Sequence, residues 1–102
     1  MKSKIYSYLC TVSLTTTITD VTVPSLSAVN EFLFIVRTGN YGSASVRGSV
    51  VIPSSVFKAK PVIYILALGG MMATVTVQYK KDTTVSVNTS ESGYNTLEIW
   101  TK

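Results

Sequence analysis

Two pairs of neighbouring residues could recognise a sugar, because each pair joins a tyrosine ring to an asparagine amide. Asn40 and Tyr41 lie in a glycine-containing segment, and Tyr94 and Asn95 lie in a polar segment near the C-terminus. Such rings present an apolar surface beside hydrogen-bonding groups, and loops of this composition on a rigid sheet are adaptable binding surfaces. These four residues are the candidate ligand-binding residues. Ordinary turn composition explains them equally well.

Binding of single-stranded nucleic acid would need basic groups interleaved with exposed aromatic rings. Arg37, Tyr41, Arg47 and the segment Tyr79-Lys80-Lys81 could supply them. The net charge is only +4, however, and Lys80-Lys81 is the only adjacent basic pair. Scattered charges are typical of a solvated surface, so the sequence disfavours a nucleic-acid partner.

The residues that usually catalyse reactions are scarce, and we predict no enzymatic activity, no metal site and no cofactor. The chain has no His and one Cys, Cys10, which we expect to be a small buried hydrophobe. Ser55 and Lys58 have a Ser-x-x-Lys spacing, but we predict an extended segment there, whereas that chemistry requires a helix. No strand face pairs two carboxylates as glycoside hydrolysis requires. The five carboxylates are Asp20, Glu31, Asp82, Glu91 and Glu98.

The elements that would position these residues are predicted to be strands. Fourteen Thr, fourteen Val and seven Ile make the chain rich in strand formers. The clearest strand signal is at 31–38. Its consecutive apolar residues predict that both faces of the strand are covered, and therefore that it lies in the centre of a sheet. Phe32, Phe34 and Val36 would lie on one side, and Leu33 and Ile35 on the other.

Alternation of apolar and polar residues predicts the remaining strands. They lie at 6–14, 18–23, 44–52, 84–88 and 96–101, with a hairpin over 62–79 that turns at Gly69-Gly70. In the first of these strands Tyr8 and Cys10 share the apolar face, with Leu9 as an exception. In the strand at 44–52, Val46 shares the apolar face with Gly48. Between the strands, 25–30 is a connection with room for one helical turn, and Val56-Phe57 would plug an edge of the core.

The pattern of short strands predicts an all-β protein, a single antiparallel β-sandwich over residues 1–102 with about seven to eight short strands. The pattern leaves jelly-roll and immunoglobulin-like topologies undistinguished. A five-stranded OB barrel would require some of the strands to be merged.

Two segments could be mistaken for membrane or export signals. Residues 1–14 imitate a short signal peptide, but Ser7 and Thr11 interrupt the apolar run. Residues 62–79 carry no charge and could just span a bilayer, yet they alternate with period two around a glycine turn. We therefore predict no membrane insertion.

The order of segments resembles the C-terminal receptor-binding head domains of bacteriophage tail-fibre and baseplate proteins. The matching pieces are Ile18 to Leu26, Glu31 to Val36, Ser49 to Pro53, Ala73 to Tyr79, and Leu97 to Trp100. The resemblance covers most of the chain after Thr15 and contains no diagnostic catalytic or ligand motif. It implies a compact β-sandwich, commonly a homotrimer, on a phage or prophage particle that recognises the bacterial surface. No binding residue can be transferred, because those loops differ between members.

The predicted function is therefore that of a virion structural protein of the tail fibre or baseplate, made in the cytoplasm of the bacterial host. It would bind a host-surface polysaccharide as a homo-oligomer, with a trimer favoured, and contact other virion proteins. Low charge (14%) beside 46% apolar residues supports burial of surface against other chains. The alternatives are a single-stranded nucleic-acid-binding OB-like module and a ligand-free capsid or tail decoration protein.

Overall fold

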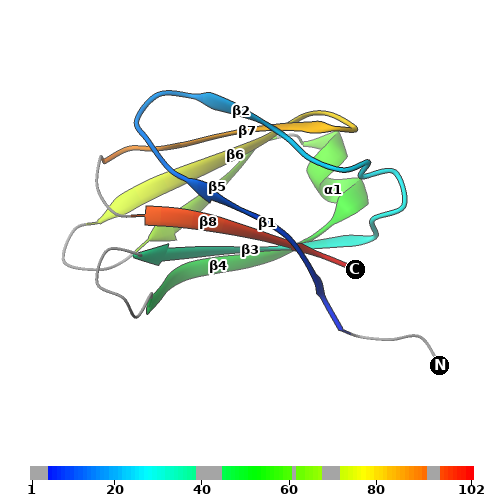
Figure 1. Cartoon of the computed structure of the whole chain (residues 1–102), viewed down its shortest axis with the longest axis horizontal. Helices are drawn as coiled ribbons and strands as arrows, with labels where there is room; N and C mark the ends of the chain where they lie inside the picture. Colours follow the sequence, from blue (N-terminus) through cyan, green and yellow to red (C-terminus); the bar gives the residue numbers. More distant parts are fainter. Residues whose placement is uncertain (1–4, 39–44, 61, 68–71, 92–94) are drawn as a thin grey trace.

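The chain folds into two four-stranded antiparallel sheets that pack face to face (Figure 1). The computed structural model describes residues 5–38, 45–60, 62–67, 72–91 and 95–102. The described elements are β1 (Ser7–Ser13), β2 (Thr19–Thr22), β3 (Glu31–Thr38), β4 (Ser45–Pro53), α1 (Ser54–Ala59), β5 (Val62–Ala67), β6 (Ala73–Lys81), β7 (Thr84–Thr89) and β8 (Asn95–Thr101). The all-β sandwich predicted from the strand pattern is confirmed.

The first sheet has the strand order β1-β8-β3-β4, and the second sheet has the order β2-β7-β6-β5. The first two strands thus pair with the last two, while β3-β4 is a hairpin and β5-β6-β7 is a meander. This order differs from the ABED and CFG order of immunoglobulin domains. Among the described residues no helix is long and apolar enough to cross a membrane.

The central strand β3 supplies much of the core, as predicted. Phe32, Phe34 and Val36 are fully buried between the sheets. Leu33 and Ile35 face outward and are only half-buried. The expectation of cover on both faces is therefore not met within the single chain, because only one face of the first sheet packs against the second sheet.

Helix α1 was not predicted, and it closes one end of the core. Pro53 ends β4, since proline cannot continue a hydrogen-bonded ladder and its φ of −61° is compatible with entering a helix. The buried ring of Phe57 lies 5.3 Å from the ring of Phe32 and 5.6 Å from that of Phe34. The expected core plug is present, whereas the extended conformation expected around Ser55 is wrong. A helix of six residues is too short to display a helical period in the sequence.

Two β-bulges change which side chains face the core. In β1 the register shifts between Tyr8 and Cys10, so Tyr8 is opposite Trp100 and Cys10 is opposite Ile99. A second shift places Val46 opposite Arg37, on the outer face. The predicted apolar-face positions of Tyr8 and Val46 are therefore wrong, because one extra residue reverses the alternation beyond it. The first bulge also accounts for Leu9, which packs against the core.

The two sheets approach closely where β4 lies beside β5. A Cβ atom added to Gly48 would lie only 2.5 Å from the backbone oxygen of Leu66 and 3.3 Å from Cγ2 of Ile65. The absence of a side chain at this position lets the backbone of β5 lie against β4. The predicted hairpin of β5 and β6 is also present, with Ala67 opposite Ala73, and its Gly69-Gly70 turn lies outside the described residues.

Candidate functional site

The strand register brings the attachment points of the two candidate binding segments together. β3 ends at Thr38 and β8 begins at Asn95, and these two residues are partners in the antiparallel ladder. Asn40, Tyr41 and Tyr94 lie outside the described residues, and Asn95 is described only through its backbone, as the first residue of β8. The segments that carry the four candidate residues therefore leave the first sheet from adjacent strand ends.

The described ends of the chain lie at the opposite end of the sandwich (Figure 1). Glu31 begins β3, and its backbone oxygen accepts a hydrogen bond from the backbone nitrogen of Lys102 at 3.0 Å. The hydroxyl of Tyr6 donates to the Glu31 carboxylate, which also pairs with Nζ of Lys102 at 3.4 Å. The eight residues of β3 place Glu31 and Thr38 about 24 Å apart. The two ends of the sandwich therefore differ. Both described chain ends lie at one end, and the two candidate segments are attached at the other.

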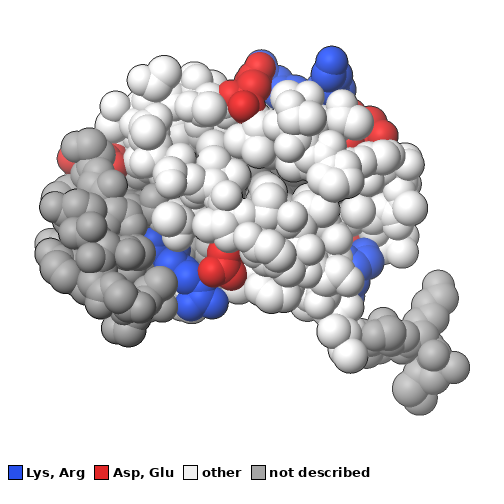
Figure 2. Space-filling model, viewed as in Figure 1, with Lys and Arg blue, Asp and Glu red and all other residues white. Residues whose placement is uncertain are grey.

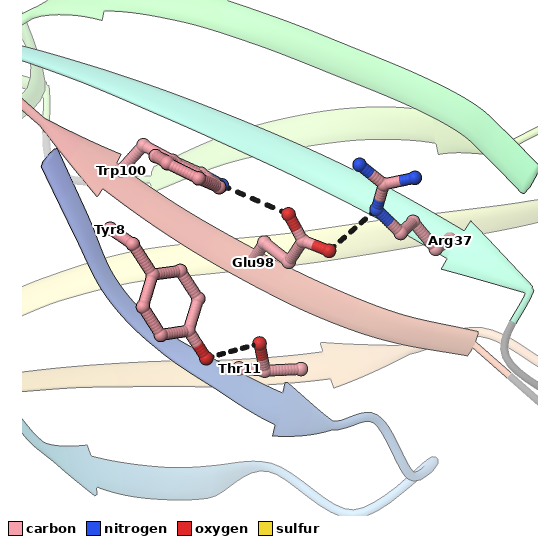
Figure 3. A network of polar contacts seen from close by, with 5 residues as sticks. All are labelled: Tyr8, Thr11, Arg37, Glu98 and Trp100. Atoms are coloured by element: carbon pink, nitrogen blue, oxygen red, sulfur yellow. Dashed lines mark hydrogen bonds and ion pairs between the residues drawn. The ribbon is translucent and has the colours of Figure 1, made fainter. Parts of the chain in front are cut away.

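A network of polar contacts lies on the outer face of the first sheet (Figure 3). The carboxylate of Glu98 accepts a hydrogen bond from Nε of Arg37 at 2.5 Å and another from Nε1 of Trp100 at 2.9 Å. The Tyr8 and Thr11 hydroxyls are 2.6 Å apart, and the Tyr8 ring meets Trp100 edge-on with 5.3 Å between centroids. These contacts hold the aromatic side chains in place on the sheet. Strand alternation placed Glu98 on the polar face but could not identify its partner on β3, Arg37.

The other described carboxylates with defined partners are held in separate contacts. Asp20 accepts a hydrogen bond from Ser86, and Asp82 accepts one from Ser25 at 2.5 Å. Among the residues that the structure describes, no three His, Cys, Asp or Glu side chains gather where they could hold a metal ion. The contacts seen for these carboxylates are those of surface and strand-strand hydrogen bonding.

The Ser-x-x-Lys spacing does lie in a helix, contrary to the expectation from the sequence. Nζ of Lys58 donates to the backbone oxygen of Leu26 at 3.2 Å and lies 5.8 Å from the centre of the Tyr79 ring. Ser55 is exposed. Lys58 therefore attaches α1 to the connection between β2 and β3. None of its described contacts is with Ser55.

Cys10 lies on the inner face of β1 beside the core, as expected, but it is only half-buried rather than buried. Burial raises the pKa of its thiol, because the charged thiolate loses hydration there. A raised pKa disfavours the nucleophilic form. The environment of Cys10 is that of a packing residue.

The residues considered for nucleic-acid stacking are divided between the two sheets. Arg37 and Arg47 lie on the neighbouring strands β3 and β4 of the first sheet, because Arg37 is opposite Val46. Arg37 is bound to Glu98 on the outer face of the first sheet. Tyr79 belongs to the second sheet, and its ring packs against Phe57 with 5.8 Å between centroids. Tyr41 lies outside the described residues. The described members of this set do not form one basic and aromatic groove.

Comparison of the chain with protein-family models, with curated proteins and with solved structures found no match. The functional argument therefore rests on the chain's own residues and their arrangement.

Proposed function

We propose that this chain is a structural protein of a phage or prophage tail fibre or baseplate that binds a host-surface glycan. The observation that carries the proposal is that the candidate segments and the described chain ends lie at opposite ends of the sandwich. The segments of Asn40-Tyr41 and Tyr94-Asn95 leave adjacent strand ends at Thr38 and Asn95, about 24 Å along β3 from the described chain ends. A protein held to a particle near its chain ends would present these segments outward.

The chemistry of the two candidate segments supports a glycan as the ligand. Each combines a tyrosine ring with an asparagine amide, the groups that recognise an apolar ring face and its surrounding hydroxyls. A small site of this kind binds weakly. Assembly of several copies, with a trimer expected, raises the overall avidity through effective concentration.

The test is binding of the multimerised protein to purified surface polysaccharides and intact cells of candidate host bacteria. We expect Tyr41→Ala and Tyr94→Ala each to weaken binding about ten-fold, because each removes one ring contact. Tyr64→Ala is the matched control, since Tyr64 is 71% exposed and lies on β5 of the second sheet, whereas the candidate segments are attached to the first sheet.

Absence of binding by the multimerised wild-type protein to every host polysaccharide tested would refute the glycan-binding role. The ligand-free decoration protein would then become the better explanation, because it shares the fold and needs only protein partners. A loss of binding in Tyr64→Ala with none in the two candidate variants would refute the assignment of the site.

A further inference from the structure

A continuous row of apolar and aromatic side chains crosses the outer face of the first sheet. Tyr8 is opposite Trp100, Trp100 is opposite Leu33, and Leu33 is opposite Val51, so the row includes all four strands. Tyr8 is 54% exposed and Val51 is 53% exposed, while Trp100 and Leu33 are half-buried. Ile35 extends the row along β3. We call these five residues the outer apolar row.

Several polar groups around the outer apolar row are already paired with one another. Glu98 binds both Arg37 and the indole nitrogen of Trp100, and the Tyr8 hydroxyl is bonded to Thr11. A second apolar surface could therefore cover the row without leaving these groups unsatisfied. The Arg37–Glu98 pair contributes no net charge, so it places no uncompensated charge beside the row. Figure 2 shows a largely uncharged surface, on which one group of basic and acidic side chains lies in the lower part of the view and the other charged groups lie near the outline.

We propose that the outer apolar row is the surface through which the chain associates with a second copy of itself. Its composition matches the centre of a subunit interface, which is more apolar than the rest of the surface and is enriched in Trp, Tyr and Arg. This proposal rests on the proposed function only for the expectation that the protein assembles, and it is independent of the glycan. Two like faces that meet form a two-fold pair, so the interface proposed here is not the threefold contact of a trimer.

The size of the face suits self-association. Four strands at about 4.8 Å spacing and the eight residues of β3 at about 3.4 Å rise define a face of roughly 500 Å². A specific interface buries about 1,000 Å² or more in total, or about 500 Å² from each partner. The whole face therefore supplies the area that a small, concentration-dependent interface needs.

The experiment measures absolute mass by light scattering after size exclusion, over protein concentrations on the order of 1–100 µM. The variant Val51→Arg places a charge in the row. The control Leu66→Arg makes the same change at a residue of 52% exposure on the second sheet, compared with 53% for Val51. We expect the wild type and Leu66→Arg to exceed the 11.0 kDa monomer mass. Val51→Arg should raise the dissociation constant at least about ten-fold, because it buries an unpaired charge.

A second variant, Tyr8→Arg, should dissociate the assembly in the same way, and the circular dichroism of each variant shows that it is folded. A wild-type protein that is monomeric over the whole range would overturn the proposal, as would equal effects of Val51→Arg and Leu66→Arg. The glycan assay on Val51→Arg separates the two proposals. A dissociated variant that binds glycan weakly supports both, whereas dissociation in a protein that never binds glycan contradicts only the proposed function.

Discussion

At the scale of single residues, Glu31 joins the two described ends of the chain. Its carboxylate accepts the Tyr6 hydroxyl hydrogen bond and pairs with Lys102, whose Nζ also lies 4.6 Å from the centre of the Tyr6 ring. The hydrogen bond to Glu31 raises the pKa of Tyr6, and desolvation and the negative charge of Glu31 act in the same direction. Ionisation of the phenol would therefore remove a contact between the N-terminal segment and the sheet.

Because of this contact, we predict that Tyr6 ionises at a higher pH in the folded protein than in the unfolded chain. Because the pKa of Tyr6 is higher in the folded state, its contribution to stability is present below the ordinary tyrosine pKa and is lost as pH rises through the folded value. The ultraviolet difference titration between the wild type and Tyr6→Phe isolates this group. We expect its midpoint above that of a free tyrosine and a return toward the ordinary value in Glu31→Gln. A midpoint unaffected by Glu31→Gln would contradict the assignment.

At the scale of elements, α1 connects the two sheets through one side chain. Phe57 packs against Phe32 and Phe34 of the first sheet and against Tyr79 of the second. Its neighbour Val56 is 47% exposed. Burial in α1 is therefore concentrated on the side of the helix that carries Phe57.

Truncation of Phe57 should therefore destabilise the protein much more than truncation of Val56. We expect Phe57→Ala to lower the free energy of unfolding by about 3–5 kcal/mol, through lost burial and a cavity. Val56→Ala should cost less than about 1 kcal/mol, as at other exposed positions. Urea denaturation measures both, and Phe57→Leu provides a milder variant if Phe57→Ala does not fold. Similar losses for Val56→Ala and Phe57→Leu would show that α1 does not anchor the core.

At the scale of the whole molecule, the described residues of the two sheets share one hydrophobic core, to which β3 of the first sheet and β6 of the second both contribute. Neither sheet has a separate core of its own. We therefore expect the sandwich to unfold as one unit.

The single tryptophan makes this expectation measurable. Trp100 reports on the first sheet, while far-ultraviolet circular dichroism reports on the strands of both. The two signals should give the same urea midpoint and slope. The measurement uses Val51→Arg, because association of the wild type would make the midpoint depend on concentration. Two separate transitions would contradict a single cooperative domain.

Most strands could be predicted from the sequence, because side-chain alternation is a local property. The bounds of β3 and the buried side of that strand were predicted correctly from its consecutive apolar residues. The positions of Tyr8 and Val46 were not, since a bulge arises from pairing with a partner strand. Helix α1 was missed because Phe57 is its only large buried residue, and one buried residue produces no helical repeat in the sequence.

The sequence alone determined the fold class and the residue types available for binding. It contains strand formers throughout, a few turn aromatics and no histidine, and these are properties of composition and spacing. Only the tertiary structure decided that Thr38 and Asn95 are neighbours, that Glu98 joins Arg37 to Trp100, and that the outer apolar row is continuous. These relations depend on sheet order and register, which bring together residues far apart in the chain, and no local pattern contains that information.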